Sequence, residues 1–203
     1  MIAPNPLTPL QIALDELDLA ASSTSSATIN AVVDLAIEIA REGREGRKIG
    51  TLFTVGAEGE VLALSRSLIL DPLAGHPAED RHVGDPNARE TIKELAQLDG
   101  GFIISGSGIA LSACRYFESR LPTSEQPLGL GTRHLAAASI STTTTAIAVV
   151  VSESSVVRVY SRGNLITEIL PELWLLHRYM PHIARPTLAG DQEHNLAIVS
   201  ETH

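Results

Sequence analysis

The chain has 203 residues, which is enough for one domain with a proper core, or at most for a small domain with an appendage. Its hydrophobic content of 44% argues against disorder, and its net charge of −9 disfavours non-specific binding to nucleic acid. The single cysteine, Cys114, excludes an intrachain disulfide and a cysteine-based zinc site, and it fits a reducing compartment.

Neither a signal peptide nor a membrane span is expected. Residues 1–21 lack the basic region and the long apolar stretch of a signal peptide. The longest strongly apolar run, residues 146–151, is far shorter than the roughly 20 residues that a membrane helix needs. We therefore expect a soluble, cytoplasmic protein that binds neither nucleic acid nor membranes.

Three segments are predicted along the chain. Residues 1–27, rich in Pro, Ser and Thr, form an N-terminal cap or linker, and residues 28–180 form the folded domain. Residues 181–203 form a C-terminal tail, which we expect to be poorly ordered beyond Pro186.

The first half of the domain is predicted to contain a helix, a hairpin, a loop and a second helix. Apolar residues from Ile29 to Ala40 recur with helical spacing, which predicts a helix that Thr28 could cap and that Gly43 or Gly46 could end. The other elements follow in chain order: a β-hairpin of residues 49–55 and 60–65, a loop over residues 71–85, and a helix that begins at Asp85-Pro86 and stops at Asp99.

The second half is predicted to be rich in β-strands. A hairpin of residues 102–105 and 109–113 comes first, and a hairpin of residues 156–160 and 165–169 comes later. Between them, a helix to about Ser141 precedes an apolar run over residues 146–151, which is typical of a central strand covered on both faces. A short helix over residues 172–180 closes the domain. This order predicts a single mixed α/β domain with a central mixed β-sheet flanked by helices.

The segment from Leu128 to Ala138 is the most informative part of the chain. A Gly-rich turn leads into a helix whose first turn carries Arg133 and His134. Basic residues are unusual there, because the N-terminus of a helix already carries partial positive charge. A bound anion would account for them. The alternative is a surface turn whose Arg and His side chains point into water.

Two acidic positions are further candidates. Asp99 lies between a predicted helix and two glycines, Gly100 and Gly101, where it could hold a divalent metal ion or accept a proton from a hydroxyl. Ser152 and Glu153 follow the apolar strand directly, at the end of the strand where α/β sheets often bind ligands. Ordinary turns are the alternative at both positions.

Two other groups of side chains have a candidate role. Tyr116 and Phe117 could form a stacking face for a base in a chain with only 3% aromatic residues, or they could pack in the core. His76, Asp80, His82 and Asp85 lie in one loop without a known metal-ligand spacing, so we expect solvated side chains. An anion site, two carboxylates and an aromatic face together match what phosphoryl chemistry on a nucleotide requires.

These motifs resemble those of the diadenylate cyclase domain family, especially its archaeal-type branch. The family carries Asp-Gly-Ala, then Thr-Arg-His-Arg and then Ser-Glu-Glu. The corresponding segments here are Asp99-Gly100-Gly101, Thr132-Arg133-His134-Leu135 and Ser152-Glu153-Ser154. Residues 50–53 and 89–98 are also similar to the family, and the resemblance covers about residues 28–175 in the right order.

The resemblance implies a twisted mixed sheet flanked by helices, with one ATP bound per domain. Two copies would meet face to face as a homodimer or higher oligomer. Each ribose 3′-hydroxyl would attack the α-phosphate of the facing ATP, giving cyclic di-AMP and two pyrophosphates. The implied cofactor is Mg²⁺ or Mn²⁺. A catalytically degenerate nucleotide-binding or regulatory module of the same fold is the alternative.

The resemblance also implies a role for each matching residue. The catalytic residues would be Asp99, Arg133 and His134. The metal ligands would be Asp99 and Glu153. The ATP-binding residues would be Gly100, Gly101, Tyr116, Thr132 and Ser152.

Three positions depart from the family motifs. Gly101 replaces Ala, which we expect to be sterically harmless. Leu135 replaces the second Arg, with the loss of a charged phosphate contact worth ~1.5–3 kcal/mol. Ser154 replaces a second acid. Because the catalytic and metal-binding residues are all kept, we favour an active enzyme over a degenerate one.

Overall fold

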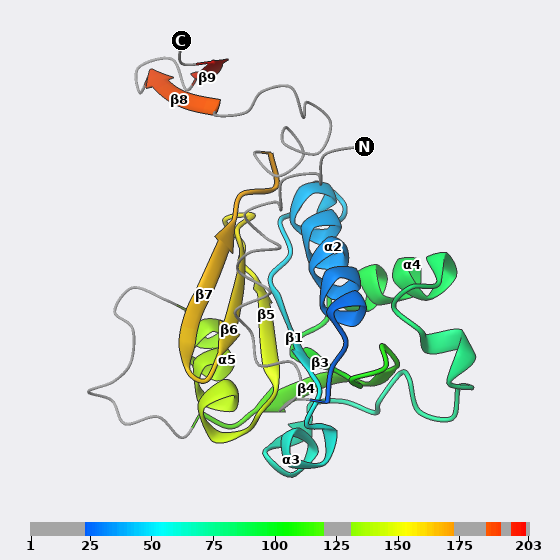
Figure 1. The fold of residues 1–203 in the computed structure, drawn as a ribbon. Coiled ribbons are helices and arrows are strands. Elements are labelled where there is room, and N and C mark those ends of the chain that lie inside the picture. The colour runs from blue at the N-terminus through cyan, green and yellow to red at the C-terminus, as the bar shows by residue number, and fades with distance from the viewer. Residues whose placement is uncertain (1–22, 120–130, 173–185, 192–195, 202–203) are drawn as a thin grey trace, which may run out of the picture.

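The computed structural model describes residues 23–119, 131–172, 186–191 and 196–201. Its centre is a seven-stranded mixed sheet with the strand order β2-β4-β3-β1-β5-β6-β7 (Figure 1). β1 pairs with β3 in parallel and with β5 in antiparallel orientation. The strands are β1 (Thr51–Val55), β2 (Ser65–Ser67), β3 (Gly101–Ile104), β4 (Ala110–Phe117), β5 (Ile147–Val151), β6 (Val157–Ser161) and β7 (Asn164–Ile169).

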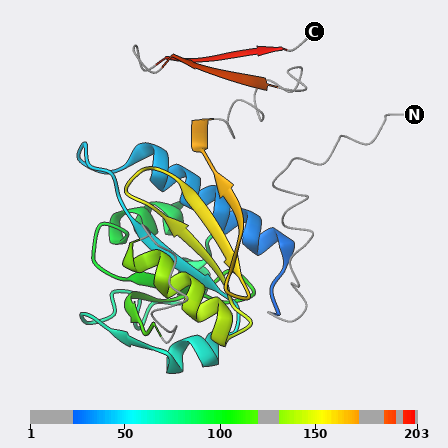
Figure 2. The same ribbon diagram turned by 90° about the vertical axis from the view of Figure 1, so that its left-hand side faces the viewer.

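Helices cover both faces of the sheet (Figures 1 and 2). One apolar cluster joins α2 and α4 to Phe53 and Val55 of β1, whereas a second joins α3 and α5 to Leu52 of the same strand. This alternation follows from the pleat of a β-strand, in which successive side chains point to opposite faces. The helices are α2 (Ser26–Glu42), α3 (Glu58–Ala63), α4 (Pro86–Leu95) and α5 (Thr132–Thr143), with a 3₁₀ turn at Glu79–Arg81. The predicted mixed α/β domain is confirmed.

The ends of α2 and α4 follow from local capping. Ser25, not Thr28, caps α2 by accepting a hydrogen bond from the Thr28 amide, and Gly43 ends this helix with a φ of 56°. The Thr28 hydroxyl instead donates to the Gly106 carbonyl oxygen at 2.9 Å. Asp85 caps α4 as predicted, since its carboxylate accepts from two backbone amides of the first turn.

The predicted hairpin of residues 49–55 and 60–65 is wrong. After β1 the chain forms the short helix α3, and β2 pairs with β4 at the far edge of the sheet. Both edges of β1 are already occupied by β3 and β5, so no place beside it remains for a hairpin partner. The stretch Glu60–Ala63 is also made mostly of good helix formers, and its Val61 is buried beneath the sheet.

The two predicted hairpins of the second half are confirmed as β3–β4 and β6–β7. β5 is fully buried and contacts α2 and α5 on its two faces, as its apolar run predicted. In the described part of the C-terminal segment, β8 (Pro186–Asp191) and β9 (Leu196–Glu201) pair in antiparallel orientation. Ile198 and Val199, two β-branched residues, favour the strand conformation of β9. The predicted helix over residues 172–180 lies almost entirely outside the described residues.

Candidate functional site

The candidate motifs come from one end of the sheet. Because β5 runs antiparallel to β1, with Val151 opposite Thr51, the segment after β5 lies beside the start of β1. β3 runs parallel to β1 and β4 antiparallel to β3, so the start of β3 and the end of β4 reach the same end of the sheet. Three segments therefore lie at the same end of the sheet. In order outward from β5, they are Ser152-Glu153, Asp99-Gly100 and Tyr116.

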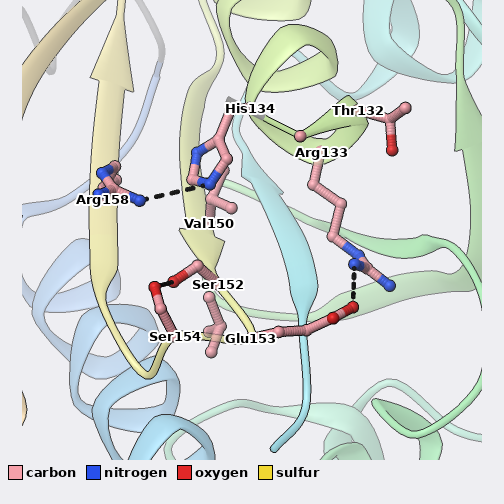
Figure 3. A pocket seen from close by; sticks show the side chains of 10 residues that line it. Thr132, Arg133, His134, Val150, Ser152, Glu153, Ser154 and Arg158 are labelled. Carbon is pink, nitrogen blue, oxygen red and sulfur yellow. Dashed lines mark hydrogen bonds and ion pairs between the residues drawn. The ribbon is translucent and has the colours of Figure 1, made fainter. Parts of the chain in front are cut away.

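A pocket of about 470 Å³ opens between the start of α5 and the end of β5 (Figure 3). It brings together the segment Thr132–His134 and the segment Ser152–Glu153, which are separate in the sequence. One further charged side chain, Arg158 of β6, was missed from the sequence. The lining residues are Gly131, Thr132, Arg133, His134, Val150, Val151, Ser152, Glu153, Ser154 and Arg158.

The start of α5 leaves backbone N–H groups available to the pocket. Gly131 is its N-cap and has no side chain to accept a hydrogen bond from the first turn, which also holds no acidic residue. A helix of this kind presents partial positive charge at its N-terminus. Since Gly131 and Thr132 both line the pocket, the positive end of α5 faces the space where an anion would bind.

Arg133 and Glu153 form an ion pair across the mouth of the pocket. Arg133 Nη1 lies 3.1 Å from Glu153 Oε1, and the Glu153 side chain is 71% exposed. Gly50 lies against this pair: a Cβ atom there would come within 2.8 Å of Arg133 Nη1. Exposed ion pairs contribute only about 0–1 kcal/mol, so a ligand can rearrange this one at little cost.

His134 lies at the inner wall of the pocket and is only 6% exposed. Its Nε2 atom is 3.4 Å from Arg158 Nη1, and its Nδ1 atom is 3.2 Å from the Tyr160 hydroxyl oxygen. A guanidinium can only donate, so Nε2 accepts from Arg158. The proton of the neutral ring is then on Nδ1, which donates to the Tyr160 oxygen.

The surroundings of His134 favour its neutral form. Burial and the neighbouring Arg158 cation lower the pKa of the imidazole below its ordinary value. Arg133 acts in the same direction, and Glu168 opposes it. His134 is therefore a neutral hydrogen-bonding group near pH 7, not a cation that attracts phosphate.

This lowered pKa predicts a pH-dependent stability. Below about pH 6.5 the unfolded chain protonates His134 more readily than the folded one, so the free energy of unfolding falls as the pH falls through this range. The stability is fully retained above that pH. Urea unfolding gives this free energy at pH 7.5 and at pH 5.5. Its decrease between the two pH values should be larger for the parent protein than for His134→Gln. An equal loss in both proteins would contradict the lowered pKa.

Ser152 organises the turn between β5 and β6. Its hydroxyl oxygen accepts from the Val156 amide at 3.2 Å and lies 2.6 Å from the Ser154 hydroxyl. Its backbone N–H donates to the Val156 carbonyl oxygen at 2.9 Å. Ser152 thus both shapes an ordinary strand-end turn and lines the pocket.

Asp99, Gly100 and Gly101 lie at the same edge of the sheet but do not line the pocket. Asp99 is exposed and lies just beyond the end of α4. Gly100 has a φ of 103°, and a Cβ atom there would lie 2.7–2.8 Å from the backbone of Cys114 and Arg115. Only glycine fits such a position.

Glycine at position 101 is accommodated without a clash, as expected, whereas an alanine would be crowded there. A Cβ atom there would lie 2.4 Å from the Leu52 carbonyl oxygen and 2.9 Å from a ring carbon of Phe117. β1 and β3 therefore approach each other here more closely than an alanine permits.

Tyr116 and Phe117 do not form one stacking face. Phe117 is buried in the apolar cluster on the α3/α5 side of the sheet, which confirms core packing for this residue. Tyr116, next to it in β4, points to the opposite face and is 46% exposed. The guanidinium carbon of Arg66 lies 4.7 Å from the centroid of its ring. A contact between Tyr116 and adenine stays a prediction.

Asp99 and Glu153 are the two carboxylates that the sequence predicted as metal ligands. No group of three or more His, Cys, Asp or Glu side chains within metal-binding range occurs in the described ranges, the loop of residues 71–85 included. Asp99 and Glu153 are exposed oxygen donors at one edge of the sheet. Mg²⁺ is commonly held by one or two carboxylates together with substrate phosphates and water, which matches this donor set.

No helix in the described part of the chain has the length and apolar character that crossing a membrane would require.

Sequence comparisons agree on one family. The family model named DAC and described as "DisA bacterial checkpoint controller nucleotide-binding" matches residues 38–165. A diadenylate cyclase of Methanocaldococcus jannaschii is 45% identical over 166 residues, and one of Haloferax volcanii is 42% identical over 161 residues. These matches cover 81% and 77% of this chain, but only 52% and 58% of the relatives. The chain thus spans little more than half the length of these relatives.

The fold is also similar to that of a solved structure. The crystal structure of a double mutant of DacA from Staphylococcus aureus matches with a TM-score of 0.50 and 24% sequence identity. The match covers 75% of this chain and 94% of that one. At this identity the likeness supports the fold alone.

Proposed function

Because this chain belongs to the DAC family of nucleotide-binding domains, we propose that it is a diadenylate cyclase. It condenses two ATP molecules into cyclic di-AMP and releases two pyrophosphates. The observation that carries this proposal is the pocket in which the uncapped start of α5, Arg133 and the Ser152-Glu153 turn converge. These groups are the kinds that bind phosphates.

The pocket holds the phosphates of one ATP. The backbone N–H groups of Thr132 and Arg133 and the Thr132 hydroxyl donate to phosphate oxygens, and the Arg133 side chain supplies a charged, forked donor. Phosphoryl transfer develops charge on the phosphate oxygens, so fixed donors aimed at them stabilise the transition state. Tyr160 and Arg158 hold His134 in one orientation, and its neutral ring forms the inner wall of the pocket.

Asp99 acts on the attacking hydroxyl. It lies at the sheet edge outside the pocket of its own chain, so we assign it to the ribose 3′-hydroxyl, whose proton its carboxylate accepts. Asp99 and Glu153 would hold a Mg²⁺ or Mn²⁺ ion, which when bound neutralises charge on the phosphates. Glu153 pairs with Arg133 here and would have to release it to bind an ion.

A second copy of the chain is required. One pocket of about 470 Å³ accounts for the phosphates of one nucleotide, whereas the product joins two nucleotides. We propose that two copies meet face to face so that each 3′-hydroxyl attacks the α-phosphate held by the other. The reaction needs ATP, and a free cysteine such as Cys114 is typical of a reducing compartment, so we assign the protein to the cytoplasm.

This arrangement predicts that activity depends on protein concentration. Dilution should lower the rate of cyclic di-AMP formation per subunit, because a separated subunit carries only half of a reaction centre. The rate is measured across a dilution series, and analytical ultracentrifugation of the same samples gives the fraction of monomer. A rate per subunit that stays constant down to a fully monomeric sample would contradict the face-to-face arrangement.

The degenerate module of the same fold is the second candidate. Leu135 and Ser154 favour it, because both replace charged residues of the family motifs. Measuring ATP binding and product formation on one sample separates the candidates. Binding with turnover supports the cyclase, whereas tight binding without turnover under both Mg²⁺ and Mn²⁺ would identify the degenerate module.

A further inference from the structure

Arg158 places a second cation in the phosphate pocket. It reaches the pocket from β6, whereas Arg133 reaches it from α5, and Figure 3 shows His134 between the two arginines. The two side chains come from different elements, which β5 separates along the chain.

The fold fixes the direction of Arg158. Its neighbours Val157 and Val159 are buried in the apolar cluster on the α2/α4 side of the sheet. By the pleat of the strand, Arg158 therefore points to the other face, which α5 covers. Tyr160 points the same way and reaches His134. Arg158 is thus directed at the start of α5 by the strand register, and not by a flexible loop.

Arg158 is held firmly for an arginine. Its side chain is only 16% exposed, and its Nε atom donates to Glu168 Oε2 at 2.5 Å. Its Nη1 atom donates to His134 Nε2 at 3.4 Å. A guanidinium carries five N–H donors in a planar fork, and these two contacts use only part of them. A partly buried cation that lines an open pocket is a strong site for an anion.

We propose that Arg158 is the second phosphate-binding arginine of this enzyme, supplied by β6 where the family motif supplies one at the position of Leu135. The inference rests on the proposed function, because it assigns the phosphates of ATP to this pocket. Leu135 is not among the lining residues, so the loss of the motif arginine leaves Arg133 as the single cation from α5. Arg158 restores a pair, with one guanidinium on each side of His134.

The two arginines, Arg133 and Arg158, explain how a pocket that also contains a carboxylate can attract a polyanion. Arg133 is paired with Glu153 at the mouth, and Arg158 is paired with Glu168, which is not among the lining residues. Of the two carboxylates, only Glu153 therefore lies in the pocket itself. Arg158 supplies the excess of positive charge on the inner side, and its contribution should grow with the number of phosphates in the ligand.

The test measures binding of ATP and of inorganic triphosphate by isothermal titration calorimetry with EDTA present. Arg158→Gln should raise the dissociation constant of both ligands about ten- to a hundred-fold, as expected for the loss of a charge-assisted hydrogen bond. Arg162→Gln is the matched control, because Arg162 lies at the other end of the same hairpin and does not line the pocket. This control should bind both ligands like the parent protein.

Arg158→Lys keeps the charge and guards against a folding defect. If circular dichroism shows that Arg158→Gln is unfolded, the Lys variant decides the question, and it should bind triphosphate more weakly than the parent because an ammonium lacks the planar fork. Parent-like binding by a folded variant would overturn the role of Arg158. A parent protein that binds neither ATP nor triphosphate would instead refute the proposed function itself.

Discussion

Asp99→Asn is expected to abolish the formation of cyclic di-AMP while largely sparing ATP binding. The amide cannot accept the proton of the 3′-hydroxyl and is a poorer metal ligand than the carboxylate. Loss of a general base alone lowers rates about 100- to 10,000-fold. ATP binding should persist because the residues that line the phosphate pocket do not include Asp99.

Two measurements on the same variant test this role. Product formation is followed with saturating ATP and Mn²⁺, and ATP affinity is measured without metal, so that a lost metal ligand does not affect the binding result. Asp80→Asn is the matched control, since Asp80 is an exposed acid in the 3₁₀ turn and does not line the pocket. Normal turnover by Asp99→Asn would show that the assigned role is wrong.

Gly101→Ala is expected to destabilise the protein, although alanine is the residue of the family motif. Its Cβ atom would lie 2.4 Å from the Leu52 carbonyl oxygen, and that oxygen belongs to the backbone of the central strand β1. To relieve this clash, β1 and β3 would have to move apart at the end of the sheet where Asp99 lies. Overpacking of this kind costs about 1–3 kcal/mol of unfolding free energy.

Gly59→Ala is a control for which we expect the free energy of unfolding to rise instead of fall. Gly59 lies within α3, and a Cβ atom there would meet nothing within 4 Å. Alanine should therefore stabilise the protein by about 0.5–1 kcal/mol through its higher helix propensity. Urea unfolding of both variants gives the comparison. Equal or greater stability of Gly101→Ala would contradict the close approach of β1 and β3.

Local signals predicted those elements whose partners are near in sequence. The Gly-Ser-Gly turn predicted β3–β4, and Asp85-Pro86 predicted the start of α4, because the capping and turn residues act within a few positions. The strand over residues 49–55 was also recognised, but its partners were not. β1 pairs with β3 and β5, which lie about fifty and one hundred residues further along the chain. No local pattern in residues 56–65 carries that information.

The same distinction applies to the site. The sequence singled out Arg133 and Glu153 separately, one at a helix start and one at a strand end, but did not predict their ion pair. Arg158 was not found, although the alternation of Val157 and Val159 already placed its side chain on the opposite face. What that face meets depends on α5 packing over β5 and β6, which only the tertiary structure supplies. The split of Tyr116 from Phe117 follows from strand alternation and could have been foreseen.

We propose above all that this chain joins two ATP molecules into cyclic di-AMP. The most direct test incubates the purified protein with ATP and either Mg²⁺ or Mn²⁺, and quantifies nucleotides and pyrophosphate by mass spectrometry. We expect cyclic di-AMP with two pyrophosphates released per molecule formed, and none of either with Asp99→Asn. A folded, ATP-binding protein that yields no cyclic di-AMP with either metal would contradict it.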